Sequence, residues 1–205
     1  QKGYILKTQA NPGYLEIVEG SIFDHELIER LFANADFCVN LVGILFEKGK
    51  NNFNNIHVEF PKMISRYASI YKLEKFVHLS ALSIENAKDS IYAQSKLKGE
   101  KEILKNFNNA VIARPSIVYS VDDNFTTQLM TLLGLLPIFP IYYNGKTKFR
   151  PIFCSDLTSA ITKIITGDIK ENIIEFAGPE EMSFKEILEK LLSLIGKKRL
   201  LLPMP

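Results

Sequence analysis

Three short, almost continuously apolar runs constrain the fold of this 205-residue chain more than any other feature. They lie at residues 37–43, 76–80 and 110–113, and stretches with apolar residues at helical spacing separate them. Strands that are apolar on both faces are typical of parallel sheets, because helices cover both faces of such a sheet. The alternation therefore predicts an α/β fold, a doubly wound parallel sheet with right-handed crossovers.

A change in pattern after residue 120 predicts a second, smaller part of the chain. Residues 125–136 fit a helix, and Ser183 with Glu186 forms a capping box that opens another helix. We therefore expect residues 1–120 to form the sheet-based core and residues 121–205 to form a smaller α/β lobe that is interleaved with the core.

Further elements are expected around this frame. Alternating or β-branched runs predict strands, and capping residues before apolar periodic stretches predict helices. The strands are expected at 14–19, 148–154 and 173–176, and the helices are expected to begin after Asp24, near Val58, at Tyr92 and at Ser155 or Asp156.

Composition excludes several classes of function. The formal net charge is +2 with scattered lysines, so nothing in the charge pattern calls for a nucleic-acid partner. Cys38 and Cys154 lie in apolar runs, which indicates reduced core cysteines of an intracellular protein. The histidines at 25, 57 and 78 lack the spacing of metal ligands, so no metal site is expected. No apolar run reaches the length of a transmembrane helix and no signal peptide is visible.

Chemistry is indicated where the second apolar run ends. That run ends at Ser80, and twelve residues later a predicted helix carries Tyr92 and Lys96, four residues apart and so on one face. A lysine ammonium beside a tyrosine lowers the pKa of the phenol and lets it exchange a proton. This pattern indicates a redox or epimerase-type pocket, with Tyr92, Lys96 and Ser80 as candidate catalytic residues; the alternative is a Tyr-x-x-x-Lys spacing of purely structural origin.

Several motifs in this order resemble the extended or atypical short-chain dehydrogenase/reductase family. They lie at residues 18–24, 39–43, 77–80, 92–96, 113–119 and 153–157. The resemblance implies a Rossmann-like fold, NADP or NAD as cofactor, and a set of contacts along it. Ser21 and Ile22 would lie beside the adenine; Leu41, Val42 and Gly43 along the ribose and diphosphate; Tyr92 and Lys96 at the nicotinamide ribose; and Pro115, Ser116, Ile117 and Val118 at the nicotinamide. For the apolar members, plain core packing is the alternative.

Within that family the chain is most similar to the NAD(P)H-binding accessory subunits of respiratory complex I and their bacterial relatives. Residues 39–45, 57–62, 76–82, 92–100, 114–118 and 200–205 carry this narrower similarity. It implies respiratory-chain subunits as partners and peripheral association with a membrane. The implied location is the cytoplasm or the inner face of the inner membrane in a bacterium, and the matrix side in a mitochondrion.

Two departures from the family bear on function. No Gly-x-x-Gly-x-x-Gly occurs, although family members carry this diphosphate-binding fingerprint in a first βα unit, so we expect that unit to be cut off or disordered here. In active members the catalytic hydroxyl falls one or two positions after Ser80, where this chain has Ala81 and Leu82; Ser83 is the alternative. These departures favour a subunit that holds a nucleotide over the alternative, an NAD(P)-dependent reductase or epimerase acting on a carbonyl or a nucleotide sugar.

Two further segments have open roles. Arg150 and the pair Tyr142-Tyr143 fit either a substrate cleft between the two parts or ordinary surface packing. The apolar residues 200–205 fit a docking segment for a partner or a membrane surface, or a strand that completes the small lobe.

Overall fold

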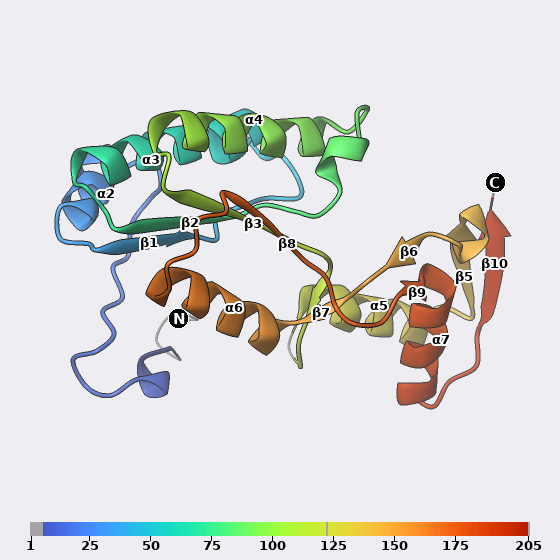
Figure 1. Ribbon diagram of the computed structural model, residues 1–205. Helices are drawn as coiled ribbons and strands as arrows, with labels where there is room; N and C mark the ends of the chain where they lie inside the picture. Colours follow the sequence, from blue (N-terminus) through green and yellow to red (C-terminus); the bar gives the residue numbers. More distant parts are fainter. Residues whose placement is uncertain (1–5, 122, 205) are drawn as a thin grey trace.

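A four-stranded parallel sheet forms the centre of the protein, as the alternating pattern predicts (Figure 1). The computed structural model describes residues 6–121 and 123–204. The strand order is β1-β2-β3-β8. The strands are β1 (Phe37–Asn40), β2 (Lys75–Leu79), β3 (Ala110–Pro115) and β8 (Ile173–Phe176). In the described residues β1 pairs with β2 alone and no strand precedes it.

Helices cover both faces of this sheet, so the winding is double. Figure 1 shows α2 (His25–Phe32), α3 (Phe60–Ile70) and α4 (Ile91–Asn106) above the sheet, with α6 (Cys154–Thr166) below it. Neighbouring strand residues alternate between the two cores because side chains alternate across a strand. Phe76 packs toward α3 and α4, whereas Val77 packs toward α6.

The segment before α3 brings the chain very close to α4. A π-helical turn, η2 (Asn55–Glu59), precedes α3, which begins at Phe60 and carries Pro61 in its first turn. Pro61 is accommodated there because the first turn needs no N–H donor at that position. Opposite this turn, a Cβ at Gly99 of α4 would collide with the carbonyl oxygen of His57. Gly99 therefore permits the close packing of η2 on α4.

Three local predictions are wrong. The single strand expected at 148–154 is divided into β6 (Lys148–Phe149) and β7 (Ile152–Phe153), and Cys154 belongs to α6. Residues 14–19 form no strand; they run as exposed, extended chain, since no partner strand lies beside them among the described residues. Helix α6 begins at Cys154 with Phe153 as its N-cap residue and no side-chain capping bond, so neither Ser155 nor Asp156 caps it. Asp24 does cap α2, accepting the Leu27 N–H at 3.0 Å.

A smaller lobe follows β3 in the chain. It contains α5 (Asn124–Leu135), α7 (Phe184–Leu194) and the parallel strands β5 (Ile138–Tyr142) and β10 (Leu200–Met204). Leu133, Ile141 and Leu188 lie in its core. Ser183 and Glu186 form the predicted capping box of α7. Of the roles considered for residues 200–205, the described ones form a strand that completes the lobe.

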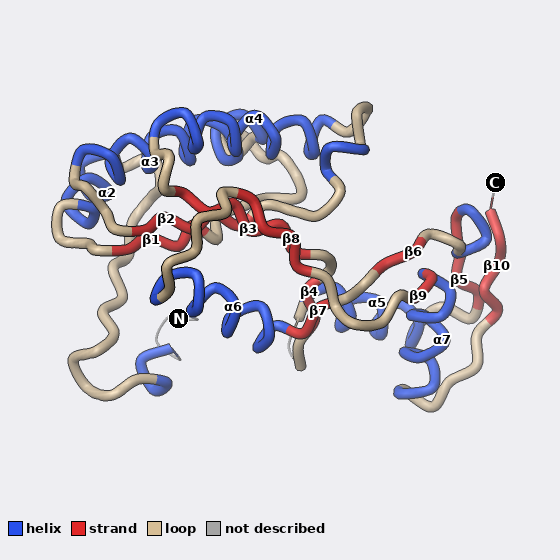
Figure 2. The backbone as a smooth tube through the Cα atoms, viewed as in Figure 1, coloured by secondary structure: helices blue, strands red, loops and turns tan. Residues whose placement is uncertain are grey.

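Short elements connect the lobe to the sheet. Figure 2 shows the chain passing between the two parts through loops and the short strands β4 and β7. Helix α6 and strand β8 belong to the core although they follow α5 and β5 in the sequence, so core and lobe are interleaved. The short elements are β4 (Val118–Tyr119), β6 (Lys148–Phe149), β7 (Ile152–Phe153), β9 (Met182–Ser183), η1 (Lys7–Gln9), η3 (Ile84–Asn86) and η4 (Tyr143–Gly145).

The described residues lack both a membrane-spanning helix and a metal-binding cluster. Within 6–121 and 123–204, no helix combines the length and the apolar character needed to cross a bilayer. The same residues contain no group of three or more His, Cys, Asp or Glu placed to hold a metal ion.

The close contact at Gly99 predicts the effect of a single methyl group. Gly99→Ala should lower the free energy of unfolding by about 1–3 kcal/mol, because η2 must move away from α4. Gly134→Ala is the matched control, since its Cβ in α5 would meet only the Lys197 ammonium at 3.9 Å. That control should be neutral or stabilise by up to about 1 kcal/mol. Urea unfolding measures both, and equal effects would contradict the close packing.

Candidate functional site

Three strand ends and one helix N-terminus meet at one edge of the sheet. Residues 41–43 follow β1, Ser80 follows β2, and Ser116 follows β3. Helix α4 starts beside them, with Ser90 as its cap: the Ser90 hydroxyl accepts the Ala93 N–H at 3.2 Å. Ligands of parallel sheets bind at this edge, where the strand order leaves a crevice.

Lys96 lies behind this edge and is almost completely buried, with 5% of its surface exposed. Its ammonium donates to the Leu79 carbonyl at 3.1 Å. Burial lowers the pKa of Lys96 to about 8, and the nearby Glu100 carboxylate opposes that shift. A Cβ at Gly43 would lie 3.4 Å from this ammonium, so the absence of a side chain at Gly43 leaves the lysine reachable from the loop after β1.

Tyr92 differs from the sequence-based expectation. Burial raises the pKa of its phenol, so the expected lowering by Lys96 is wrong in this structure. The Tyr92 ring packs edge-on against His57, with ring centroids 5.3 Å apart, and against Phe53 at 5.8 Å. The phenol is therefore protonated at neutral pH. The Lys96 ammonium hydrogen-bonds to the Leu79 carbonyl at the end of β2.

A cavity of about 670 Å³ opens beside Tyr92, between the core and the small lobe. Tyr92 and residues 115–118 line it together. Ser80 is not among its lining residues: the Ser80 hydroxyl is buried and has no hydrogen-bond partner. Ser83 does line the cavity. The remaining lining residues are Leu45, Ala81, Leu82, Phe125, Lys148, Phe149, Arg150 and Glu181.

Arg150 thus lines the cavity, whereas Tyr142 and Tyr143 do not belong to its lining and are more than half exposed on the small lobe. Leu41 is also exposed, and Val42 packs against the core on the α3 side.

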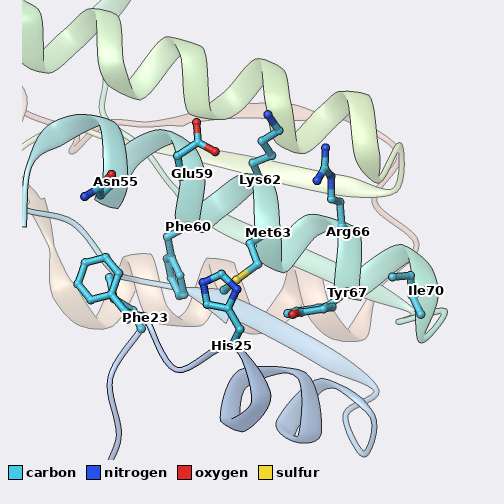
Figure 3. Close-up of a pocket in the computed structure, with 11 residues that line it drawn as sticks. Phe23, His25, Asn55, Glu59, Phe60, Lys62, Met63, Arg66, Tyr67 and Ile70 are labelled. Carbon is cyan, nitrogen blue, oxygen red and sulfur yellow. The ribbon is translucent and has the colours of Figure 1, made fainter. Parts of the chain in front are cut away.

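Ser21 and Ile22, the residues expected beside an adenine, do not line the cavity beside Tyr92. Ile22 lines a separate groove of about 500 Å³ between α2 and α3. Figure 3 shows Phe23 and His25 facing Phe60 and Met63 across this groove. Ser21 is exposed, and its hydroxyl accepts the Phe23 N–H at 3.1 Å.

His57 connects the loop after β1 to helix α4, a role that spacing in the sequence did not reveal. The Ile44 N–H donates to His57 Nε2 at 3.1 Å. His57 Nδ1 lies 2.9 Å from the Ser95 hydroxyl, which itself donates to the Tyr92 carbonyl at 2.7 Å. Because Nε2 accepts, the ring is neutral with its proton on Nδ1. Burial and the Lys96 charge lower the pKa of His57 to about 4.

A second buried histidine pairs across the sheet. His78 and Asn40 are register partners on β2 and β1, and Asn40 Nδ2 donates to His78 Nδ1 at 2.9 Å. Asn40 Oδ1 accepts the Val42 N–H at 3.0 Å, which fixes the turn after β1. Burial lowers the pKa of His78 to about 3. A histidine inside the otherwise apolar run 76–79 is the sequence signal that could have indicated this pair.

A buried ion pair joins β3 to α4. Arg114 donates to Glu100 through Nε at 3.1 Å and through Nη2 at 2.6 Å, and 4% and 3% of these residues are exposed. Arg114 Nη1 also lies 2.8 Å from Glu85 on η3. Bidentate geometry of this kind fixes orientation as well as distance.

The chain is similar in sequence to subunits of mitochondrial NADH dehydrogenase. No family model matches the chain. It is 30% identical over 189 residues to the mitochondrial NADH dehydrogenase [ubiquinone] 1 alpha subcomplex subunit 9 of Dictyostelium discoideum, covering 91% of this chain and 52% of that protein. It is 23% identical over 201 residues to the protein of the same name from Mus musculus, covering 98% and 53%. The chain thus spans about half the length of these relatives.

Solved structures agree on the fold. UDP-glucuronic acid 4-epimerase from Bacillus cereus, in complex with NAD, superposes with a TM-score of 0.79 at 22% identity, covering 99% of this chain and 73% of that one. dTDP-4-dehydrorhamnose reductase from Bacillus anthracis, in complex with NADP, gives a TM-score of 0.78 at 16% identity, covering 100% and 80%.

The chain thus has a Rossmann-like α/β fold, shared with an epimerase and a reductase that were solved with NAD and NADP. Across most of its length the chain is homologous to the alpha subcomplex subunit 9, or 40 kDa subunit, of mitochondrial complex I.

The buried neutral histidines predict a pH dependence of stability. The unfolded chain titrates His57 near 6.5 and the folded protein near 4, so the unfolded state binds more protons between these values. The free energy of unfolding should therefore fall as the pH decreases from 6.5 to 4, by on the order of 3 kcal/mol for this residue. Urea unfolding across this range should show a shallower pH slope for His57→Gln; a slope equal to that of the wild type would refute the assignment.

The Arg114–Glu100 pair predicts a large loss on removing one partner. Glu100→Gln should lower the free energy of unfolding by about 3 kcal/mol or more, because the guanidinium stays buried with reduced compensation. The control is Glu189→Gln in the exposed Lys185–Glu189 pair, at 3.7 Å, which should change stability by less than about 0.5 kcal/mol. Thermal and urea unfolding measure both, and a small effect at Glu100 would show that Glu85 alone compensates Arg114.

Proposed function

We propose that this chain is the nucleotide-binding part of a complex I-associated protein that holds NAD(P)(H) without turning it over. The observation that carries the proposal is the open approach to the Lys96 ammonium at the edge of the sheet, where a Cβ at Gly43 would lie 3.4 Å from that ammonium. A glycine there admits a ligand's ribose close to a buried cation, and Tyr92 stands four residues earlier on the same helix face. Residues 1–120 would serve as the binding core and 121–205 as the partner or substrate lobe.

The residues present suit the nicotinamide half of such a ligand. In this proposal Lys96 and Tyr92 hold the ribose, and Pro115, Ser116, Ile117 and Val118 cover the nicotinamide. Leu41, Val42 and Gly43 follow the diphosphate, with Ser21 and Ile22 at the adenine. A bound nicotinamide would supply hydride transfer. Either NAD or NADP fits, since relatives of this fold carry the one or the other.

Two features favour holding over turnover. The Ser80 hydroxyl is buried outside the cavity, so it is not poised to orient a carbonyl. Burial also raises the pKa of Tyr92, which makes the phenolate less available at neutral pH. Homology to a complex I subunit supports a stable assembly role, with other subunits as partners and a position on the matrix side or, in a bacterium, at the inner face of the inner membrane.

A reductase or epimerase is the second candidate. The cavity of about 670 Å³ beside Tyr92 favours it, because it gives a carbonyl substrate room next to the phenol. Tyr92 would then be the acid, Lys96 its partner and Ser83 the nearest hydroxyl in the cavity wall.

Ligand binding by the full-length protein tests the proposal. NADPH or NADH at about a hundredfold excess over its dissociation constant should raise the melting temperature by roughly 5–10 °C, by mass action on the folded state. Lys96→Met should abolish the shift, whereas Lys98→Met, at an exposed position of the same helix, should retain it.

The absence of a shift with every dinucleotide would overturn the proposal. Turnover is measured separately with a panel of carbonyl compounds and nucleotide sugars. If the wild type reduces any of them and Tyr92→Phe does not, the protein is an enzyme and the proposal that it only holds the nucleotide is wrong.

A further inference from the structure

A second cavity borders the cavity beside Tyr92, at the side of the small lobe. The second cavity has a volume of about 420 Å³. Ile117 and Phe125 line both, so the two spaces meet at these side chains. Together they form a two-part cavity whose first part contains Tyr92 and whose second part lies between α5 and α7.

The second part is apolar inside. Met130 of α5, Met182 of β9 and Ile187 and Leu191 of α7 line it. Its polar lining consists of Tyr119, Ser120, Thr126, Glu180 and Lys190; the Thr126 hydroxyl donates to Asp123 at 2.5 Å, and Lys190 forms an exposed pair with Glu180 at 3.2 Å. A ligand in this part therefore gains apolar burial along its methionine, isoleucine and leucine side chains. Methionine side chains also adapt readily to flexible chains.

Charged side chains lie at the rim of the first part of the cavity. Lys148, Arg150 and Glu181 line it, two cations against one carboxylate, so the rim is net positive. Lys148 lies 3.8 Å from Glu181, both more than half exposed, and Arg150 makes only a long bond of 3.5 Å to the Pro179 carbonyl. Exposed pairs of this kind exchange partners at little cost, so Arg150 is available to an anion.

We propose that this two-part cavity binds a long-chain acyl ligand with an anionic head group. The head lies at Lys148 and Arg150, and the chain passes Ile117 and Phe125 into the space between α5 and α7. The head is a carboxylate or a phosphate, since both offer the same bidentate chemistry to arginine. A nucleotide sugar would leave its hydroxyls without partners among Met130, Met182 and Leu191. The ligand is distinct from the dinucleotide, and its binding requires no turnover.

Titration of the full-length protein with cis-parinaric acid, a fluorescent fatty acid, tests the proposal. Saturable binding with one site per chain is expected. Leu191→Trp and Met130→Trp, which fill the second part, should weaken it about tenfold or more. Leu135→Trp is the control, because it places the same ring at a residue of α5 that is 75% exposed. Equal affinities for the control and both filling variants would overturn the proposal.

Two measurements use only the wild-type protein, so a variant that fails to fold cannot affect them. In a series of saturated fatty acids, affinity should rise about fourfold per methylene until the cavity is full. Oleate and oleoyl lysophosphatidate should each displace the probe, and the stronger competitor identifies the head group. A flat chain-length series, or displacement by UDP-glucuronic acid and not by oleate, would overturn the proposal.

A comparison of a charged and an uncharged ligand tests whether the head group lies at Arg150. Arg150→Gln should weaken oleate binding severalfold while leaving oleyl alcohol unchanged, because only the former carries a charge. Equal loss for both ligands would contradict a head group at Arg150. All titrations are repeated with saturating NADPH, so that failure of acyl binding and failure of nucleotide binding are seen separately.

Discussion

The buried pair of Arg114 and Glu100 is the constraint on which the rest of the site depends. It fixes helix α4 against β3 through two hydrogen bonds in an almost water-free position. Glu100 is one helical turn beyond Lys96, and its charge limits the fall in the pKa of that lysine. The same helix carries Tyr92 into the cavity wall and, through Ser95, contacts His57. One ion pair thus fixes the helix that carries Tyr92 and Lys96, the proposed ribose-holding residues. The same pair supplies the carboxylate that favours the charged form of Lys96.

Around that helix, two neutral histidines define the loop after β1. His57 accepts the Ile44 N–H, and Asn40, held by His78, accepts the Val42 N–H. Both backbone donors flank Gly43, so the loop is held on each side of this glycine. A ligand that enters there meets a preformed backbone, which reduces the entropy lost on binding.

Much of this fold could be predicted from the sequence, because apolar runs and helical periodicity report burial directly. The sheet strands, the helices from α2 to α7 and the capping box of α7 follow from local pattern. The strand expected at 14–19 fails because alternation indicates a strand only where another strand is available to pair with it. The roles of His57 and His78, and the raised pKa of Tyr92, depend on burial between elements distant in sequence, which local pattern does not encode. The second cavity, which borders Ile117 and Phe125, likewise arises only once α5 and α7 pack.

The interleaving of the two parts has a consequence for folding. Strands β5 and β10 pair in register from Ile138 with Leu200 onward, and the chain between them includes α6 and β8 of the core. The small lobe therefore closes a loop of roughly 60 residues before it gains its own pairing, an entropic cost that local helices do not face. Docking of α6 and β8 on the sheet shortens that search by bringing α5 and α7 together. From this connectivity we expect the sheet to form first and the cavity between α5 and α7 to be among the last regions to take shape.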